Sequence, residues 1–77
     1  MEARIQIKLF ATLQRFRPAS AENYAIETGT TIRTLLQQID LPENKAKLVF
    51  IDGVKAELTT VLQGGERIGI FPPVGGG

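Results

Sequence analysis

Residues 31–42 read TIRTLLQQIDLP, and this stretch carries the strongest helical pattern of the chain. Its apolar residues recur at the i, i+3, i+4 and i+7 spacing of one helix face, and they are Ile32, Leu35, Leu36 and Ile39. A threonine at the start can cap the helix, and Pro42 is expected to stop it. The pattern therefore predicts one helix over residues 31–41.

Two strands are predicted before this helix. Residues 4–10 place apolar side chains at every second position, which is typical of a half-buried strand. Residues 11–23 contain a proline and small polar residues, so they are expected to form a loop with a short turn at 13–16. A weaker strand follows at 24–28.

Two strands are also predicted after the helix. Residues 48–51 form a short apolar run that ends at Asp52-Gly53, a dipeptide typical of a type I′ hairpin turn. Gly64-Gly65 marks a further turn. Residues 67–71 alternate again, and Pro72-Pro73 ends this last strand because proline cannot donate to a sheet ladder.

This order of elements is typical of an α+β fold in which one main helix packs across a mixed sheet. It is the β-grasp, or ubiquitin-like, pattern, in which the first and last strands lie side by side. A doubly wound nucleotide-binding fold would need longer helices alternating with parallel strands. Residues 1–77 are expected to form a single domain with a flexible tail at 72–77. The predicted core consists of Leu35, Leu36 and Ile39 packed on Ile5, Ile7, Ile68 and Ile70.

The composition limits the chemistry that the chain can perform by itself. Its 77 residues include neither histidine nor cysteine, which excludes thiol nucleophiles, imidazole acid–base catalysis, disulfides and the usual zinc sites. Ser20 supplies a hydroxyl, but no histidine is present to activate it. We therefore expect a protein that is not an enzyme, that binds no metal or cofactor, and that uses the catalytic groups of a partner.

Charge and hydropathy narrow the partners further. The net charge is +1 and no basic run is present, so nucleic acid is not an expected partner. No apolar stretch approaches the thickness of a bilayer, and the first residues alternate apolar with charged side chains, unlike a signal peptide. These features predict a cytoplasmic protein that does not contact membranes.

The last residues, 72–77, read PPVGGG. Two prolines hold the chain extended, and three glycines give an end without side chains that can enter a passage only as wide as a backbone. A frayed terminus or a cloning remnant would look the same in isolation. The residues before this tail decide between the two interpretations.

Residues 62–77, LQGGERIGIFPPVGGG, resemble the end of the MoaD/ThiS family of ubiquitin-like sulfur carrier proteins, and especially the molybdopterin synthase small subunit. In that family a leucine, two turn residues, an acidic residue and an alternating strand lead into Phe-Pro-Pro-Val, a small residue and Gly-Gly. Residues 8–13, KLFATL, extend the resemblance toward the start of the chain. Gly65 stands where the family often has aspartate, and Gly75 where it usually has alanine or serine, whereas Gly76-Gly77 match.

The resemblance implies that the carboxylate of Gly77 carries the chemistry, at the end of a tail that includes Gly75 and Gly76. An E1-like adenylating enzyme of the MoeB/ThiF type would use ATP to activate this carboxylate, and a sulfur donor would then convert it to a thiocarboxylate. A thiocarboxylate can attack an acceptor without a neighbouring base. The implied acceptor is a pterin precursor on the molybdopterin synthase large subunit (MoaE type), in molybdenum cofactor biosynthesis.

Alternatives stay open at this point. Carriers with similar tails serve thiamine thiazole synthesis, tRNA thiolation, tungsten-cofactor synthesis or protein conjugation, each with another acceptor enzyme as partner. A β-grasp interaction module would instead bind a partner by its sheet and never form a thiocarboxylate.

The predicted partner-binding surface joins the sheet to the tail. Phe10 and Phe71 fall on the outward faces of the first and last strands and are expected to face solvent, flanked by cations such as Arg67. A single exposed aromatic is ordinary, and one ring could fold under a loop, but two together favour a docking patch. The full predicted set is Phe10, Arg67, Phe71, Pro72, Pro73 and Val74.

Overall fold

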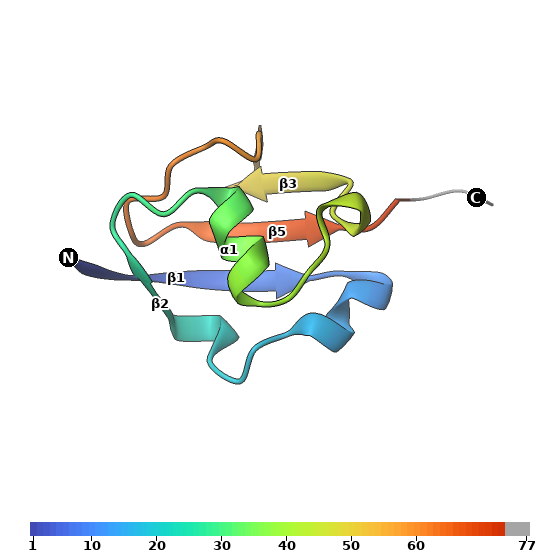
Figure 1. Cartoon of the computed structure of the whole chain (residues 1–77), viewed down its shortest axis with the longest axis horizontal. Helices are drawn as coiled ribbons and strands as arrows, with labels where there is room; N and C mark the ends of the chain where they lie inside the picture. The colour runs from blue at the N-terminus through green and yellow to red at the C-terminus, as the bar shows by residue number, and fades with distance from the viewer. Residues whose placement is uncertain (74–77) are drawn as a thin grey trace.

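The computed structural model describes residues 1–73, which form one five-stranded sheet with one α-helix on it (Figure 1). The strands and the helix are β1 (Glu2–Leu9), β2 (Tyr24–Glu27), α1 (Ile32–Gln38), β3 (Leu48–Ile51), β4 (Val54–Ala56) and β5 (Arg67–Phe71). Three short 3-10 helices connect them: η1 (Ala11–Phe16), η2 (Ala21–Asn23) and η3 (Glu43–Lys45). All four predicted strands are present, and β4 is an addition to the prediction.

The sheet has the strand order β2-β1-β5-β3-β4. β1 and β5 are parallel, whereas the other neighbours are antiparallel, so the sheet is mixed as predicted. In the β1–β5 ladder Gln6 lies opposite Arg67 and Lys8 opposite Gly69. Because these two strands run in the same direction, their C-terminal ends meet at one edge of the sheet, and the chain leaves the sheet there (Figure 1). This is the β-grasp arrangement.

The core lies between α1 and the sheet. The predicted core residues Leu35, Leu36, Ile39, Ile5, Ile7, Ile68 and Ile70 are all buried in one apolar cluster. Leu13 of η1, Leu41 and Leu62 extend the cluster to the connecting segments. No polar or charged side chain is buried among residues 1–73. The predicted core is confirmed.

The helix α1 begins as predicted, but it ends at Gln38 instead of residue 41, and its end is not caused by Pro42. Thr31 caps it by accepting a hydrogen bond from a backbone N–H one turn later, at 3.2 Å. At the other end Asp40 has a φ of 60°, and the N–H of Leu41 donates to the carbonyl of Leu36 at 2.9 Å. This left-handed residue with its backward bond is a Schellman motif, which ends a helix. The prediction that Pro42 stops the helix was therefore wrong.

The β3–β4 hairpin fixes the start of β5. Asp52 and Gly53 have φ values of 51° and 85°, both positive as a type I′ turn requires, so the predicted turn is confirmed. The Asp52 carboxylate accepts a hydrogen bond from the N–H of Arg67 at 3.0 Å, and its own N–H donates to the Arg67 carbonyl at 2.9 Å. The turn is thus bonded to β5. β4 has only three residues, too few to show an alternating pattern in the sequence.

Candidate functional site

Three phenylalanines from three parts of the sheet form an aromatic cluster on its outward face. Phe10 and Phe71 stack with ring centroids 4.1 Å apart and planes inclined by 3°. Phe50 of β3 meets Phe71 edge-on, at 5.7 Å and 86°. Such pairs contribute about 0.5–1.5 kcal/mol beyond the burial of their area. The cluster therefore gives this face an apolar surface made of three packed rings.

Phe10 and Phe71 lie on the outward face as predicted, but each ring covers one face of the other. Both are only partly exposed, and so is Phe50. Below the stacked rings Gly69 forms the floor, because a Cβ there would lie 3.5 Å from the Phe10 ring. The expectation of two freely exposed rings is corrected to one stacked pair.

A shallow hollow lies over this cluster, and we call it the aromatic hollow. It is lined by Lys8, Phe10, Phe50, Gly53, Arg67, Ile68, Gly69 and Phe71. Lys8 and Arg67 are exposed, and within residues 1–73 neither forms an ion pair. The hollow thus offers an apolar floor with two cations that a partner can contact.

The chain leaves the sheet beside the aromatic hollow. The N–H of Lys47 donates to the carbonyl of Phe71 at 2.9 Å and fixes the end of β5. Pro72 is partly buried and Pro73 is exposed, and neither has an N–H to continue the ladder. The structure thus brings Phe10, Arg67 and Phe71 around one hollow, and the two prolines follow Phe71 directly in the chain. The other predicted site residues, Val74, Gly75, Gly76 and Gly77, lie outside the described residues.

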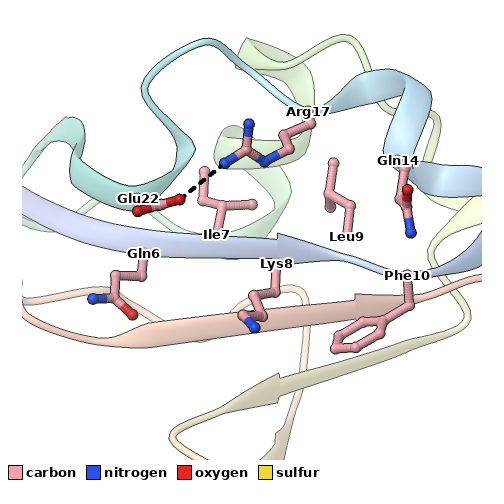
Figure 2. Close-up of a pocket in the computed structure, with 8 residues that line it drawn as sticks. All are labelled: Gln6, Ile7, Lys8, Leu9, Phe10, Gln14, Arg17 and Glu22. Carbon is pink, nitrogen blue, oxygen red and sulfur yellow. Dashed lines mark hydrogen bonds and ion pairs between the residues drawn. The ribbon is translucent and has the colours of Figure 1, made fainter.

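A second hollow, of about 580 Å³, runs along β1 beside the segment that contains η1 and η2. Figure 2 shows its lining: Ile7 and Leu9 point to one side of β1, and Gln6, Lys8 and Phe10 to the other. An ion pair between Arg17 and Glu22, with N and O 3.3 Å apart, lies at its rim (Figure 2). Its lining contains one amine, Lys8, and one carboxylate, Glu22, and Glu22 is paired with Arg17 rather than placed to activate a nucleophile. We therefore assign no chemistry to this second hollow.

The described part of the chain has neither a metal-binding cluster nor a helix that could span a membrane. Across residues 1–73, no three side chains of His, Cys, Asp or Glu gather in a way that could hold a metal ion. No helix in the same range has the length and apolar composition to cross a membrane. The site therefore consists of aromatic rings and cations, next to the point where the C-terminal segment leaves the sheet.

The family model described as the ThiS family matches residues 7–77. The chain belongs to the ThiS family. This match includes the aromatic hollow and extends through residues 74–77, which the structure does not describe. A comparison of this ThiS family protein with curated proteins gave no match.

Solved structures share the fold of this ThiS family protein. The solution structure of the Haloferax volcanii HVO 2177 protein has a TM-score of 0.76 at 18% identity, over 99% of this chain and 88% of that one. The putative molybdopterin converting factor, subunit 1, from Pyrococcus furiosus has a TM-score of 0.64 at 23% identity, over 94% and 99%. SAMP1 from Haloferax volcanii has a TM-score of 0.68 at 20% identity, over 97% and 100%. These likenesses confirm the β-grasp fold.

Sequence reasoning missed Phe50 as a member of the site. Residues 48–51 read LVFI and are all apolar, so the sequence does not indicate which of their side chains face away from the core. The strand register assigns Phe50 to the outward face, because Phe50 lies opposite Gly69 of β5, whose position faces outward. Placing β3 next to β5 in a β-grasp sheet would have brought Phe50 to the same face as Phe71.

Proposed function

We propose that this ThiS family protein is a sulfur carrier whose C-terminal glycine, Gly77, is adenylated and then converted to a thiocarboxylate. The observation that supports this most is the relation between the tail and the aromatic hollow. β5 ends next to the hollow, and Pro72 and Pro73 begin the PPVGGG segment there. A partner that binds the hollow would therefore have the base of the tail at its own surface.

The chemistry requires an outside source of energy, because a carboxylate is a poor acyl electrophile. We propose that an E1-like enzyme supplies it: a carboxylate oxygen of Gly77 attacks ATP, and pyrophosphate leaves as the acyl adenylate forms. A donor that supplies sulfur at the sulfide level, such as hydrosulfide, then attacks the carbonyl carbon through that sulfur, AMP leaves, and loss of the S–H proton gives the thiocarboxylate. The resulting thiocarboxylate is a nucleophile that needs no neighbouring base, which suits a chain with no histidine and no cysteine.

The chain's own residues contribute binding and direction. The stacked pair of Phe10 and Phe71 presents an ordered surface, so little side-chain entropy is lost when a partner binds it. The bond from Lys47 to the Phe71 carbonyl fixes the point from which the tail starts. The glycines beyond it add no side chain, so a narrow passage in the partner can admit them.

For the acceptor we propose a pterin precursor bound to a molybdopterin synthase large subunit, in the cytoplasm where ATP is available. The Phe-Pro-Pro-Val sequence at residues 71–74 supports this choice. The shared fold of the putative molybdopterin converting factor from Pyrococcus furiosus is in keeping with it. Thiamine thiazole synthesis and tRNA thiolation are the alternatives for a carrier with this tail.

A second candidate function is that of a protein modifier. The fold likeness to the small archaeal modifier protein 1 of Haloferax volcanii favours it, with a TM-score of 0.67 over 94% of this chain. A modifier would use the same activated Gly77 but transfer the whole chain to an amine. Incubation with the activating enzyme and cell extract separates the two, because a modifier yields products larger than the chain itself.

Removal of Gly76 and Gly77 distinguishes the proposed sulfur carrier from a β-grasp module that only binds a partner. We expect the shortened chain to keep its fold and to lose activation and sulfur transfer completely, because the reacting carboxylate is displaced. Circular dichroism checks the fold, and the release of pyrophosphate from ATP reports activation. Activation of the full chain and the shortened chain at the same rate would contradict the proposal.

A further inference from the structure

Cations without an acidic partner gather where the chain leaves the sheet. Within residues 1–73 the arginines that form ion pairs with side chains are Arg4, Arg17 and Arg33. Arg15, Lys45 and Lys47 form none, although all three are exposed and free to reach a carboxylate. We call these three residues the basic collar.

One aromatic ring brings two members of the basic collar together. Phe16 of η1 is half-buried and packs against the core. The guanidinium carbon of Arg15 lies 5.4 Å from the centre of its ring, and the Nζ of Lys45, from η3, lies 6.0 Å from the same point. Two like charges from distant parts of the sequence thus share one ring.

The third member ties the basic collar to the tail. The backbone N–H of Lys47 donates to the carbonyl of Phe71, directly before Pro72. η1 follows the C-terminal end of β1, which lies beside the end of β5 in the parallel pair. Figure 1 shows η1 and η3 at this edge of the sheet, on the side from which the C-terminal segment leaves. The basic collar therefore lies at the edge of the sheet from which the tail leaves.

The stability of the fold does not account for this arrangement. Like charges that share a ring repel one another, and a cation–π contact at an exposed position contributes little. Exposed charges around a binding surface have another effect, because they steer an oppositely charged partner during encounter and so raise the association rate. A carrier that visits one enzyme and then another depends on rapid association.

We infer that the basic collar docks against an acidic protein surface at the mouth of the cleft that takes up the tail, on the enzyme that activates Gly77. This inference rests on the proposed function and adds the chemistry of the partner's surface to it. The aromatic hollow supplies the apolar contact, and the basic collar orients the tail toward the cleft. The collar changes the rate of encounter more than the strength of the final complex.

Two double variants of equal charge test the inference. Arg15→Gln with Lys45→Gln removes two charges from the basic collar, and Arg4→Gln with Lys55→Gln removes two charges elsewhere. Association of each variant with the activating enzyme is followed by stopped-flow fluorescence at low and at physiological salt. We expect the collar variant to associate about tenfold more slowly at low salt, with a weaker salt dependence, and the control variant to stay within about twofold of the wild type. Thermal melts establish that both variants are folded.

The possible outcomes separate this inference from the proposed function. Equal association rates of the two variants, together with pyrophosphate release from ATP by the wild type, would overturn the inference and leave the carrier function standing. A wild type that releases no pyrophosphate would overturn both. A third outcome would also overturn the inference: the two variants associate with the activating enzyme at equal rates, and only the collar variant loses binding to a duplex RNA. The basic collar would then be a nucleic-acid contact.

Discussion

Gly64 is a position at which one added methyl group should be costly. Its φ is 122°, a backbone conformation that residues with side chains rarely adopt, and a Cβ there would lie 2.8 Å from the Cβ of Ala3. The Ala3 methyl is fixed to the backbone of β1 and has no rotamer by which to move away. The substitution Gly64→Ala must therefore push the turn at residues 62–66 away from β1.

The size of the effect follows from two terms. Forcing a residue with a Cβ into a positive φ costs about 1–2 kcal/mol. Overpacking against a fixed neighbour costs about 1–3 kcal/mol more. Glu66 opposes relaxation of the turn, because its carboxylate accepts hydrogen bonds from the N–H groups of Gln63 and Gly64, both at 2.7 Å. We expect Gly64→Ala to lower the free energy of unfolding by about 2–5 kcal/mol, a large share for a small domain.

Urea denaturation followed by far-UV circular dichroism measures this loss, and the chain supplies two controls. Gly65 also has a positive φ, of 84°, but a Cβ there meets no atom within 4 Å, so Gly65→Ala should show the backbone term alone. Adding Ala3→Gly to Gly64→Ala removes the clash and should restore about 1–3 kcal/mol relative to the sum of the two single changes. Equal losses for Gly64→Ala and Gly65→Ala, or no rescue by Ala3→Gly, would refute the reasoning.

Three further substitutions test the core, the hairpin and the binding surface. Leu36→Ala should lower the free energy of unfolding by about 2–5 kcal/mol, and a loss below about 1 kcal/mol in urea would place Leu36 outside the core. Asp52→Ala removes the acceptor for the N–H of Arg67 and should cost about 1–3 kcal/mol in the same assay, whereas an unchanged midpoint would show that this bond does not fix β5. Phe71→Ala should weaken binding to the activating enzyme roughly tenfold or more, as measured by calorimetry, and unchanged affinity of a folded variant would exclude the aromatic hollow as the docking surface.

Much of the fold was predictable because one face of each long strand is buried. Alternation at residues 4–10 and 67–71 located β1 and β5, and the Asp52-Gly53 dipeptide located the hairpin turn. The end of α1 was not predictable, because aspartate adopts a left-handed conformation only in some contexts and nothing in the sequence marks Asp40 for it. The helical turn η1 was only partly anticipated, since a short 3-10 segment has no apolar periodicity.

The candidate site was predictable only where it follows the strands. Phe10 and Phe71 could be assigned to one face from alternation and from the neighbouring positions of the first and last strands. Their stacking over Gly69 is a property of three-dimensional packing that alternation alone does not reveal. Arg15 and Lys45 belong to η1 and η3, which are separated along the chain by η2, β2 and α1, so only the folded structure brings both to Phe16. The tail residues remain predictions.

Formation of a thiocarboxylate at Gly77 is the direct test of the carrier function, and a chain extended by one alanine after Gly77 is its matched control. The extension moves the carboxylate by about 3.3–3.6 Å, and a misplacement of reacting atoms by even about 1 Å can cost roughly a hundredfold in rate. Both chains are incubated with the activating enzyme, ATP and a sulfur source, and intact-mass spectrometry follows the products. We predict that the wild type gains the mass difference between sulfur and oxygen and that the extended chain gains nothing. Equal conversion of the two chains, or no conversion of the wild type, would contradict the carrier function.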